Sequence, residues 1–239
     1  MIGRRWGDGP PAFVLLHGLG VASRMMAPLA VRLAEHGPVL APDLPGFGAN
    51  EQDEELSLLE HVEAVRRWLD ERGESLTLVG CSLGAQIALH VAAARPDWLH
   101  ALVLASPTMD PAVRSWPAIA TRWPLETALQ SPSFWRLQYE DHGRAGLGRV
   151  LRTTRQAMDD RPEDLVGSVE VPTLVLRGTR DPLVGDAWAA QLAAGLPNRV
   201  HVRLPRARHA MTYEEPVLVA TAIERFLTDH FPLDLRGHP

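Results

Sequence analysis

Three side chains that lie far apart in the sequence, Ser82, Asp181 and His209, have the types needed for nucleophilic catalysis. A serine hydroxyl is a poor nucleophile at neutral pH, so it needs a base to take its proton and an acid to orient that base. Each of the three follows a stretch that reads as a buried strand. We therefore predict that Ser82 attacks a carbonyl carbon, that His209 carries the proton, and that Asp181 orients His209.

The serine lies in Gly80-Cys81-Ser82-Leu83-Gly84, a G-x-S-x-G sequence. The apolar run before Gly80 predicts a strand, and the pattern from Leu83 onward predicts a helix. Glycines at positions 80 and 84 remove side chains that would collide with backbone in so sharp a turn. A glycine-rich turn without catalytic role is the alternative, but the strand before it and the helix after it favour a nucleophile.

The acid and the base are chosen by their places in the chain. Asp181 directly follows the apolar run 174–176, and Asp110, after the preceding strand, is the second candidate for the acid. Of the ten histidines, His209 is the one in a loop after the last predicted strand. An aspartate in a turn before proline and a surface histidine are the alternatives, and the order serine, acid, histidine favours the catalytic interpretation.

An acyl-transfer site also needs two N–H donors for the negative charge that develops on the carbonyl oxygen. We expect one from the backbone of Leu83, which follows the nucleophile, and the other from Leu19, in the loop after the early strand 13–16. His17, at the end of that strand, is expected to position the loop by hydrogen bonding. Cys81 is expected to pack or to line a pocket.

Composition excludes several other chemistries. The chain has 239 residues, enough for one domain with a large core, and a formal net charge of −5, which argues against nucleic-acid binding. It contains no lysine, so a lysine Schiff base cannot form, and its single cysteine cannot form an internal disulfide. We find no signal-peptide pattern and no apolar run that could span a bilayer, so we expect a cytoplasmic protein that does not bind membranes.

Apolar runs alternate with helical patterns along most of the chain, which predicts an α/β fold with a mainly parallel sheet covered by helices on both faces. The expected strands are 1–6, 13–16, 39–41, 76–79, 101–105, 172–176 and 200–204. The expected helices are 24–35, 58–69, 83–94, 186–194 and 216–227, with Ser57 capping the second of them and Gly73 stopping it.

The alternation breaks between residues 108 and 170, where no strand pattern occurs and Trp116, Trp123 and Trp135 are found. We predict that 108–170 is a helical cap of a few short helices, and that 1–107 and 171–239 form the core. The cap would lie at the carboxyl edge of the sheet, where such folds bind ligands. The three tryptophans are candidate substrate-binding residues, and ordinary packing is the alternative.

Taken together, these motifs resemble the α/β-hydrolase superfamily, in its branch of esterases, proline-iminopeptidase-like enzymes and C–C hydrolases. The resemblance rests on the elbow at 80–84, on His17-Gly18-Leu19-Gly20, on the D-x-P-G-x-G loop at 43–48, on G-x-x-D-x-x-V around Asp181, and on His209 followed by E-x-P. It covers about 13–226 apart from the insertion. Arg208 stands where the family most often has glycine.

The resemblance implies a serine hydrolase that cleaves an ester of a small or medium apolar substrate through an acyl-enzyme, without a cofactor or a metal. The same three residues could instead cleave a C–C bond, open a lactone or serve lyase chemistry. A binding protein of the same fold that has lost catalysis is a further alternative. The partner expected is a small-molecule ester, and the sequence does not specify an oligomeric state.

Overall fold

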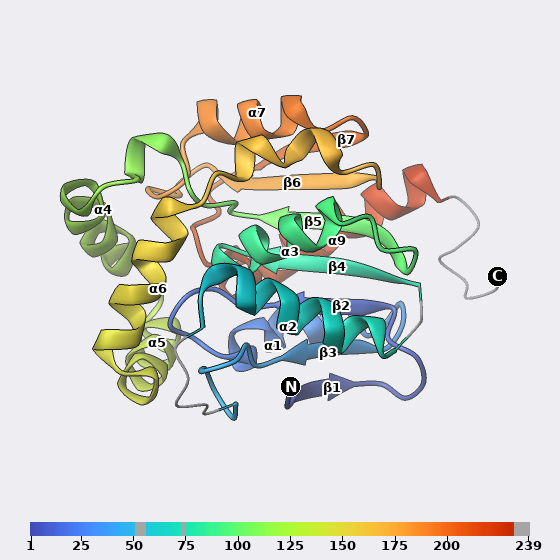
Figure 1. Ribbon diagram of the computed structural model, residues 1–239, viewed down its shortest axis with the longest axis horizontal. Coiled ribbons are helices and arrows are strands. Elements are labelled where there is room, and N and C mark those ends of the chain that lie inside the picture. Colours follow the sequence, from blue (N-terminus) through green and yellow to red (C-terminus); the bar gives the residue numbers. More distant parts are fainter. Residues whose placement is uncertain (51–55, 73–74, 232–239) are drawn as a thin grey trace.

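A computed structural model of the chain describes residues 1–50, 56–72 and 75–231. Within these residues, seven strands form one sheet in the order β1-β3-β2-β4-β5-β6-β7 (Figure 1). All neighbouring strands are parallel except β1, which pairs antiparallel with β3. The predicted mainly parallel sheet is therefore confirmed. The strands are β1 Gly3–Trp6, β2 Phe13–Leu16, β3 Val39–Pro42, β4 Leu76–Cys81, β5 Leu99–Ala105, β6 Thr173–Gly178 and β7 Arg199–Leu204.

Helices cover both faces of this sheet and bury two apolar clusters against it. One face carries α2 Leu58–Asp70, α3 Leu83–Ala93 and α7 Asp186–Gly195. The other carries α1 Ala27–Leu33, α8 Met211–Glu214 and α9 Pro216–His230. Short 3₁₀ helices complete the described structure at η1 Ser23–Met26, η2 Pro111–Val113, η3 Pro162–Asp164 and η4 Val166–Ser168.

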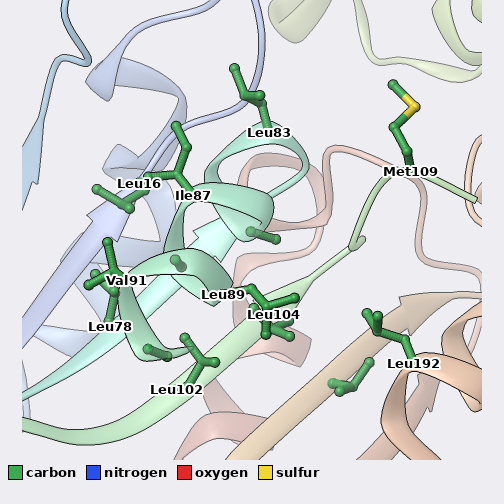
Figure 2. Close-up of a cluster of buried hydrophobic side chains, with 14 of the residues drawn as sticks. Leu16, Leu78, Leu83, Ile87, Leu89, Val91, Leu102, Leu104, Met109 and Leu192 are labelled. Carbon is green, nitrogen blue, oxygen red and sulfur yellow. The ribbon is translucent and has the colours of Figure 1, made fainter. Parts of the chain in front are cut away.

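The two helices beside the central strands differ in their surroundings. Ser57 caps α2 as predicted, in a reciprocal capping box with Glu60, and Gly73 lies outside the described residues. By contrast α3 is apolar on almost every side, because it packs between the sheet, α2 and the segment before β6. Figure 2 shows Ile87, Val91 and Leu89 of α3 in one cluster with side chains of β2, β4 and β5. This packing fixes the helix that begins immediately after Ser82.

The segment between β5 and β6 forms three helices of 13 or 14 residues, α4 Trp116–Leu129, α5 Pro132–Ala145 and α6 Leu147–Asp159. They are longer than the few short helices expected from the scattered prolines and glycines. Pro117 and Pro132 occupy first turns, where proline is tolerated, and Pro124 lies inside α4. Figure 1 shows the three helices grouped at one end of the sheet.

The inserted helices are tied to the core by buried polar contacts. The Arg24 guanidinium, in η1, donates to Asp141 and Glu140 of α5, and Asp141 also accepts from the backbone N–H of Ala22 at 3.1 Å. At the far end of the insertion, Asp160 accepts from the Gln86 amide of α3 at 2.9 Å. These contacts hold the insertion over the loop after β2 and over the start of α3.

The turn from β4 into α3 leaves no room for side chains at its two glycines. A Cβ on Gly80 would lie 2.2 Å from the Gly84 carbonyl oxygen, and a Cβ on Gly84 would lie 2.3 Å from the carbonyl oxygen of Leu16. The obstructing atoms are backbone, so they cannot move aside as a flexible side chain would. The two glycines of G-x-S-x-G are therefore required because β2, β4 and α3 pack closely at this turn.

We expect Gly84→Ala to lower the free energy of unfolding by about 3 kcal/mol, because α3 must move away from β2 to admit the methyl group. Gly143→Ala is the matched control, since a Cβ there meets no atom within 4 Å. Gly143 lies in the last turn of α5, where alanine should stabilise the helix by roughly 0.5 kcal/mol. Urea unfolding followed by circular dichroism measures both changes. Equal unfolding midpoints for the two variants would contradict the predicted clash between a Cβ at position 84 and the Leu16 carbonyl.

Candidate active site

The structure brings the three predicted side chains into one hydrogen-bonded chain. The Ser82 hydroxyl lies 3.0 Å from His209 Nε2, and the His209 Nδ1–H donates to Asp181 Oδ2 at 2.8 Å. The bond to Asp181 fixes the tautomer in which Nε2 is free to accept the serine proton. Residues 127 and 28 positions apart in the sequence therefore lie in the order that a nucleophile, a base and an orienting acid would need.

Ser82 occupies a strained backbone conformation between β4 and α3. Its φ is 57° and its ψ is −118°, a combination that non-glycine residues rarely adopt. The backbone is held on both sides, because the Ser82 N–H donates to Ala105 of β5 and the Ser82 carbonyl accepts from Ala85 in the first turn of α3. Strand and helix packing thus hold the hydroxyl at the end of the sheet, facing the insertion.

Asp181 is fully buried and held by the loop that follows β6. Its Oδ1 accepts from the N–H groups of Leu183 and Val184, at 2.8 and 3.1 Å, which leaves Oδ2 for His209. The Arg177 side chain donates to the carbonyls of Val184 and Asp181 and pairs with Asp186, so it braces the same loop. The carboxylate is oriented before any substrate arrives.

His209 is positioned through its own backbone as well as through its ring. Ser106, at the end of β5, donates its hydroxyl to the His209 carbonyl at 2.8 Å. Burial alone would lower the pKa of His209, but the neighbouring Asp181 carboxylate outweighs it, and the pKa is raised above 6.5. Arg208 directs its charge elsewhere, into an ion pair with Glu214 at 2.9 Å.

The two predicted oxyanion donors lie beside the nucleophile. Leu19 and Leu83 line the same pocket as Ser82 and His209, and Leu83 is in the first turn of α3, whose N–H groups have no acceptor within the helix. A Cβ on Gly18 would lie 3.4 Å from the Ser82 Cβ, so the loop after β2 passes close to the serine.

His17 holds that loop, as expected. The fully buried ring accepts from the Leu44 N–H at Nε2, at 2.9 Å, and donates from Nδ1 to the Gly18 carbonyl at 2.8 Å. Burial lowers the pKa of His17, which favours the neutral ring that these two bonds require. The neighbouring D-x-P-G-x-G loop is held by Asp43, which accepts from the N–H groups of Ser23 and Ala49.

The other residues considered from sequence are placed away from the reacting atoms. Asp110 accepts from the N–H groups of Ala112 and Gly185, so it joins two loops instead of orienting His209. Cys81 is packed in the core, where burial raises the pKa of its thiol to about 12.

The pocket above Ser82 has a mostly apolar lining drawn from the core and from α4, α5 and α6. Of the three tryptophans proposed from sequence, Trp123 lines it, whereas Trp116 and Trp135 do not. Trp116 and Trp135 are 41% and 51% exposed, and Trp135 stacks on Tyr139 of the same helix. The direction in which a side chain points depends on how its helix is seated, and the tryptophans themselves do not show which face of their helix is covered.

Sequence reasoning missed the polar residues of this pocket. Gln86, Thr108, Glu126, Gln130 and Gln138 all line it, and the Thr108 hydroxyl donates to Gln86 Oε1 at 3.1 Å. For Glu126 and Gln130 a signal exists, because they continue the three- and four-residue spacing that starts at Ile119 and Trp123.

Across 1–50, 56–72 and 75–231, no group of three or more His, Cys, Asp or Glu side chains is arranged to hold a metal ion. In the same residues, no helix has the length and apolar character needed to cross a membrane.

Comparisons with known proteins agree with this fold. The family model described as "Alpha/beta hydrolase family" matches residues 13–222. The crystal structure of a bromoperoxidase from Bacillus anthracis superposes with a TM-score of 0.82 over 95% of each chain, at 18% sequence identity. At that level of identity, the likeness concerns the fold.

Sequence relatives include more than one kind of enzyme. Lipase LipV of Mycobacterium tuberculosis is 37% identical over 133 residues, which are 55% of this chain and 49% of that protein. A pimeloyl-(acyl-carrier protein) methyl ester esterase of Xanthomonas campestris is 28% identical over 91% of this chain and 95% of its own length. A haloalkane dehalogenase of Mycolicibacterium paratuberculosis is 32% identical over 80% of this chain and 76% of its own length.

Proposed function

Because the chain belongs to the alpha/beta hydrolase family, we propose that it is a serine hydrolase that cleaves carboxylic esters through an acyl-enzyme. The observation that carries the proposal is the chain of hydrogen bonds from Ser82 through His209 to Asp181, at the base of a mostly apolar pocket. The lipase and esterase among the relatives support an ester as the substrate.

The proposed reaction uses each group in a definite step. Ser82 Oγ attacks the ester carbonyl while its proton passes to His209 Nε2, and Asp181 stabilises the resulting imidazolium. The N–H groups of Leu19 and Leu83 bind the oxyanion. His209 then gives the proton to the departing alcohol, and a water molecule, activated by the same ring, hydrolyses the acyl-serine.

The residue at the nucleophile position argues against dehalogenation, the activity of one relative. Displacement of a halide from a saturated carbon by Ser82 would leave an alkyl ether. Water does not readily hydrolyse such an ether, so the enzyme could not turn over. Attack on an acyl carbon instead forms an ester between the acyl group and Ser82. Water activated by the same base can hydrolyse that ester. An acyl substrate therefore fits a serine at position 82.

The pocket lining supports a small or medium substrate that is largely apolar. Met25, Ile119, Phe134 and Leu183 supply apolar surface, and Trp123 is the tryptophan that we propose contacts substrate. We propose that residues 108–170 act as a cap that completes this pocket over the core of 1–107 and 171–239.

A fluorophosphonate should label the protein stoichiometrically at Ser82, because the tetrahedral phosphorus resembles the transition state of acyl transfer. Intact mass followed by peptide mapping locates the adduct, and hydrolysis of 4-nitrophenyl butyrate should stop as labelling proceeds. A lactone and a vinylogous diketone, assayed beside the ester, test the alternatives. Absence of both labelling and ester turnover would favour a binding protein of the same fold, and preferred turnover of the diketone would favour a C–C hydrolase.

A further inference from the structure

One wall of the pocket is polar where the helix spacing calls for apolar side chains. Ile119, Trp123, Glu126 and Gln130 recur at intervals of three and four residues on α4, so they share one face of that helix, and all four line the pocket. The first two are apolar. The last two place a carboxyl and a carboxamide at the positions that would otherwise complete an apolar surface.

These two polar groups are not fully satisfied by the protein. Glu126 is 3% exposed, and its Oε1 has one long contact, 3.5 Å from the Gln130 amide nitrogen. Within the described part of the chain, Glu126 Oε2 and Gln130 Oε1 are both buried without a hydrogen-bond partner. Buried polar atoms are almost always paired, and leaving one unpaired costs about 1–3 kcal/mol. Two such atoms at the wall of a cavity indicate that a ligand supplies their partners.

The charges around Glu126 indicate which form it takes. Burial raises the pKa of Glu126, and the nearby Asp181 and Glu214 carboxylates raise it further, while His209 acts in the opposite direction. The Gln130 amide, like His209, acts to lower this pKa, and the net direction is upward. A carboxyl with a raised pKa is protonated more often than an exposed one, and its protonated form donates from one oxygen. Gln130 Oε1 can only accept. In that form of Glu126 the pair offers one donor and one acceptor.

We propose that Glu126 and Gln130 bind a hydroxyl group of the substrate, with Glu126 Oε2 donating to the hydroxyl oxygen and Gln130 Oε1 accepting the hydroxyl hydrogen. The proposal rests on the proposed function, because the hydroxyl belongs to the ester held over Ser82. The substrate class is a hydroxylated ester, apolar elsewhere. A carboxylate on the substrate would be repelled by the Asp181 and Glu214 carboxylates. An ammonium group on the substrate would be repelled by the positive charge that His209 acquires during the reaction.

Matched esters with and without one hydroxyl test this assignment. On the acyl side, 4-nitrophenyl esters of straight-chain acids with six to ten carbons are compared with their ω-hydroxy counterparts. On the alcohol side, propyl butyrate is compared with 3-hydroxypropyl butyrate. We expect the enzyme to prefer the hydroxylated ester in at least one series. Glu126→Leu and Gln130→Leu should each lower that preference, measured as a ratio of kcat/KM values, by about tenfold.

Two further variants separate the proposal from its alternatives. Glu126→Gln should keep the preference, because a carboxamide also donates to a hydroxyl. Gln156→Leu is the matched control, since its Oε1 is likewise buried without a described partner but faces a separate pocket beside Pro45 and Arg149. It should leave the ratio unchanged. Circular dichroism and thermal unfolding verify that each variant is folded.

The hydroxyl assignment is overturned if no wild-type preference exists, if the Leu variants leave the ratio unchanged, or if ω-amino esters are preferred over ω-hydroxy esters. A different pattern marks failure of the proposed function. In that case the wild type would hydrolyse none of the esters and Ser82 would resist the fluorophosphonate, and the hydroxyl subsite would fall with it.

Discussion

Ser82→Ala is expected to lower kcat for ester hydrolysis by about 10⁵- to 10⁶-fold, since it removes the atom that forms the covalent intermediate. The substitution leaves His209, Asp181 and both backbone donors in place. Any residual rate would come from substrate binding and oxyanion stabilisation. Steady-state kinetics with 4-nitrophenyl butyrate measure the loss, and thermal unfolding verifies that the variant is folded.

The same substitution should not weaken substrate binding. Alanine at 82 retains the backbone turn and opens slightly more room at the base of the pocket, so a product acid or a slow ester should bind with similar affinity. Ser133→Ala, at an exposed serine of α5, is the matched control and should leave kcat unchanged. Equal turnover by wild type and Ser82→Ala would contradict a mechanism in which Ser82 is the nucleophile.

Asp181→Asn is expected to lower kcat by about 10⁴-fold and to move the acid limb of the pH profile to lower pH. An asparagine no longer favours the Nδ1–H tautomer and no longer stabilises the imidazolium. The pKa of His209 is raised in the wild type because Asp181 outweighs the effect of burial. Without the carboxylate, burial dominates, so the pKa falls and the ring stays neutral to lower pH.

The sign of this shift distinguishes the role of Asp181 from simple damage to the fold. The base must be neutral, so kcat/KM in the wild type should rise with pH through a value above 6.5. In Asp181→Asn the midpoint of this rise should lie at a lower pH, and the maximal rate should be much smaller. Asp110→Asn is the matched control, because Asp110 bonds to Ala112 and Gly185 and should leave the midpoint where it is. A shift in Asp110→Asn alone would make Asp110 the orienting acid.

Local sequence determined which residues could form the candidate site and at which ends of which strands they lie. Positions 80 and 84 must be glycine because backbone atoms lie too close to admit a Cβ at either position. Their spacing around Ser82 can therefore be recognised in the sequence. Asp181 and His209 follow predicted strands whose parallel pairing places their carboxyl ends at one edge of the sheet. Both features depend on near neighbours and on a regular alternation, which a sequence displays directly.

The insertion was decided by tertiary structure. Trp116, Trp123 and Trp135 were equal candidates from sequence, yet Trp123 lines the pocket and the other two are half exposed. Which face of α4 meets Ser82 depends on how the three helices are seated, and Arg24, Asp141 and Asp160 fix this through contacts more than 70 residues apart. Spacing alone groups Glu126 with Ile119 and Trp123 on one face of a helix, but the same packing decided that this face lines the pocket with His209. No local pattern encodes which face is buried, because that burial exists only once distant helices and the sheet edge have packed together.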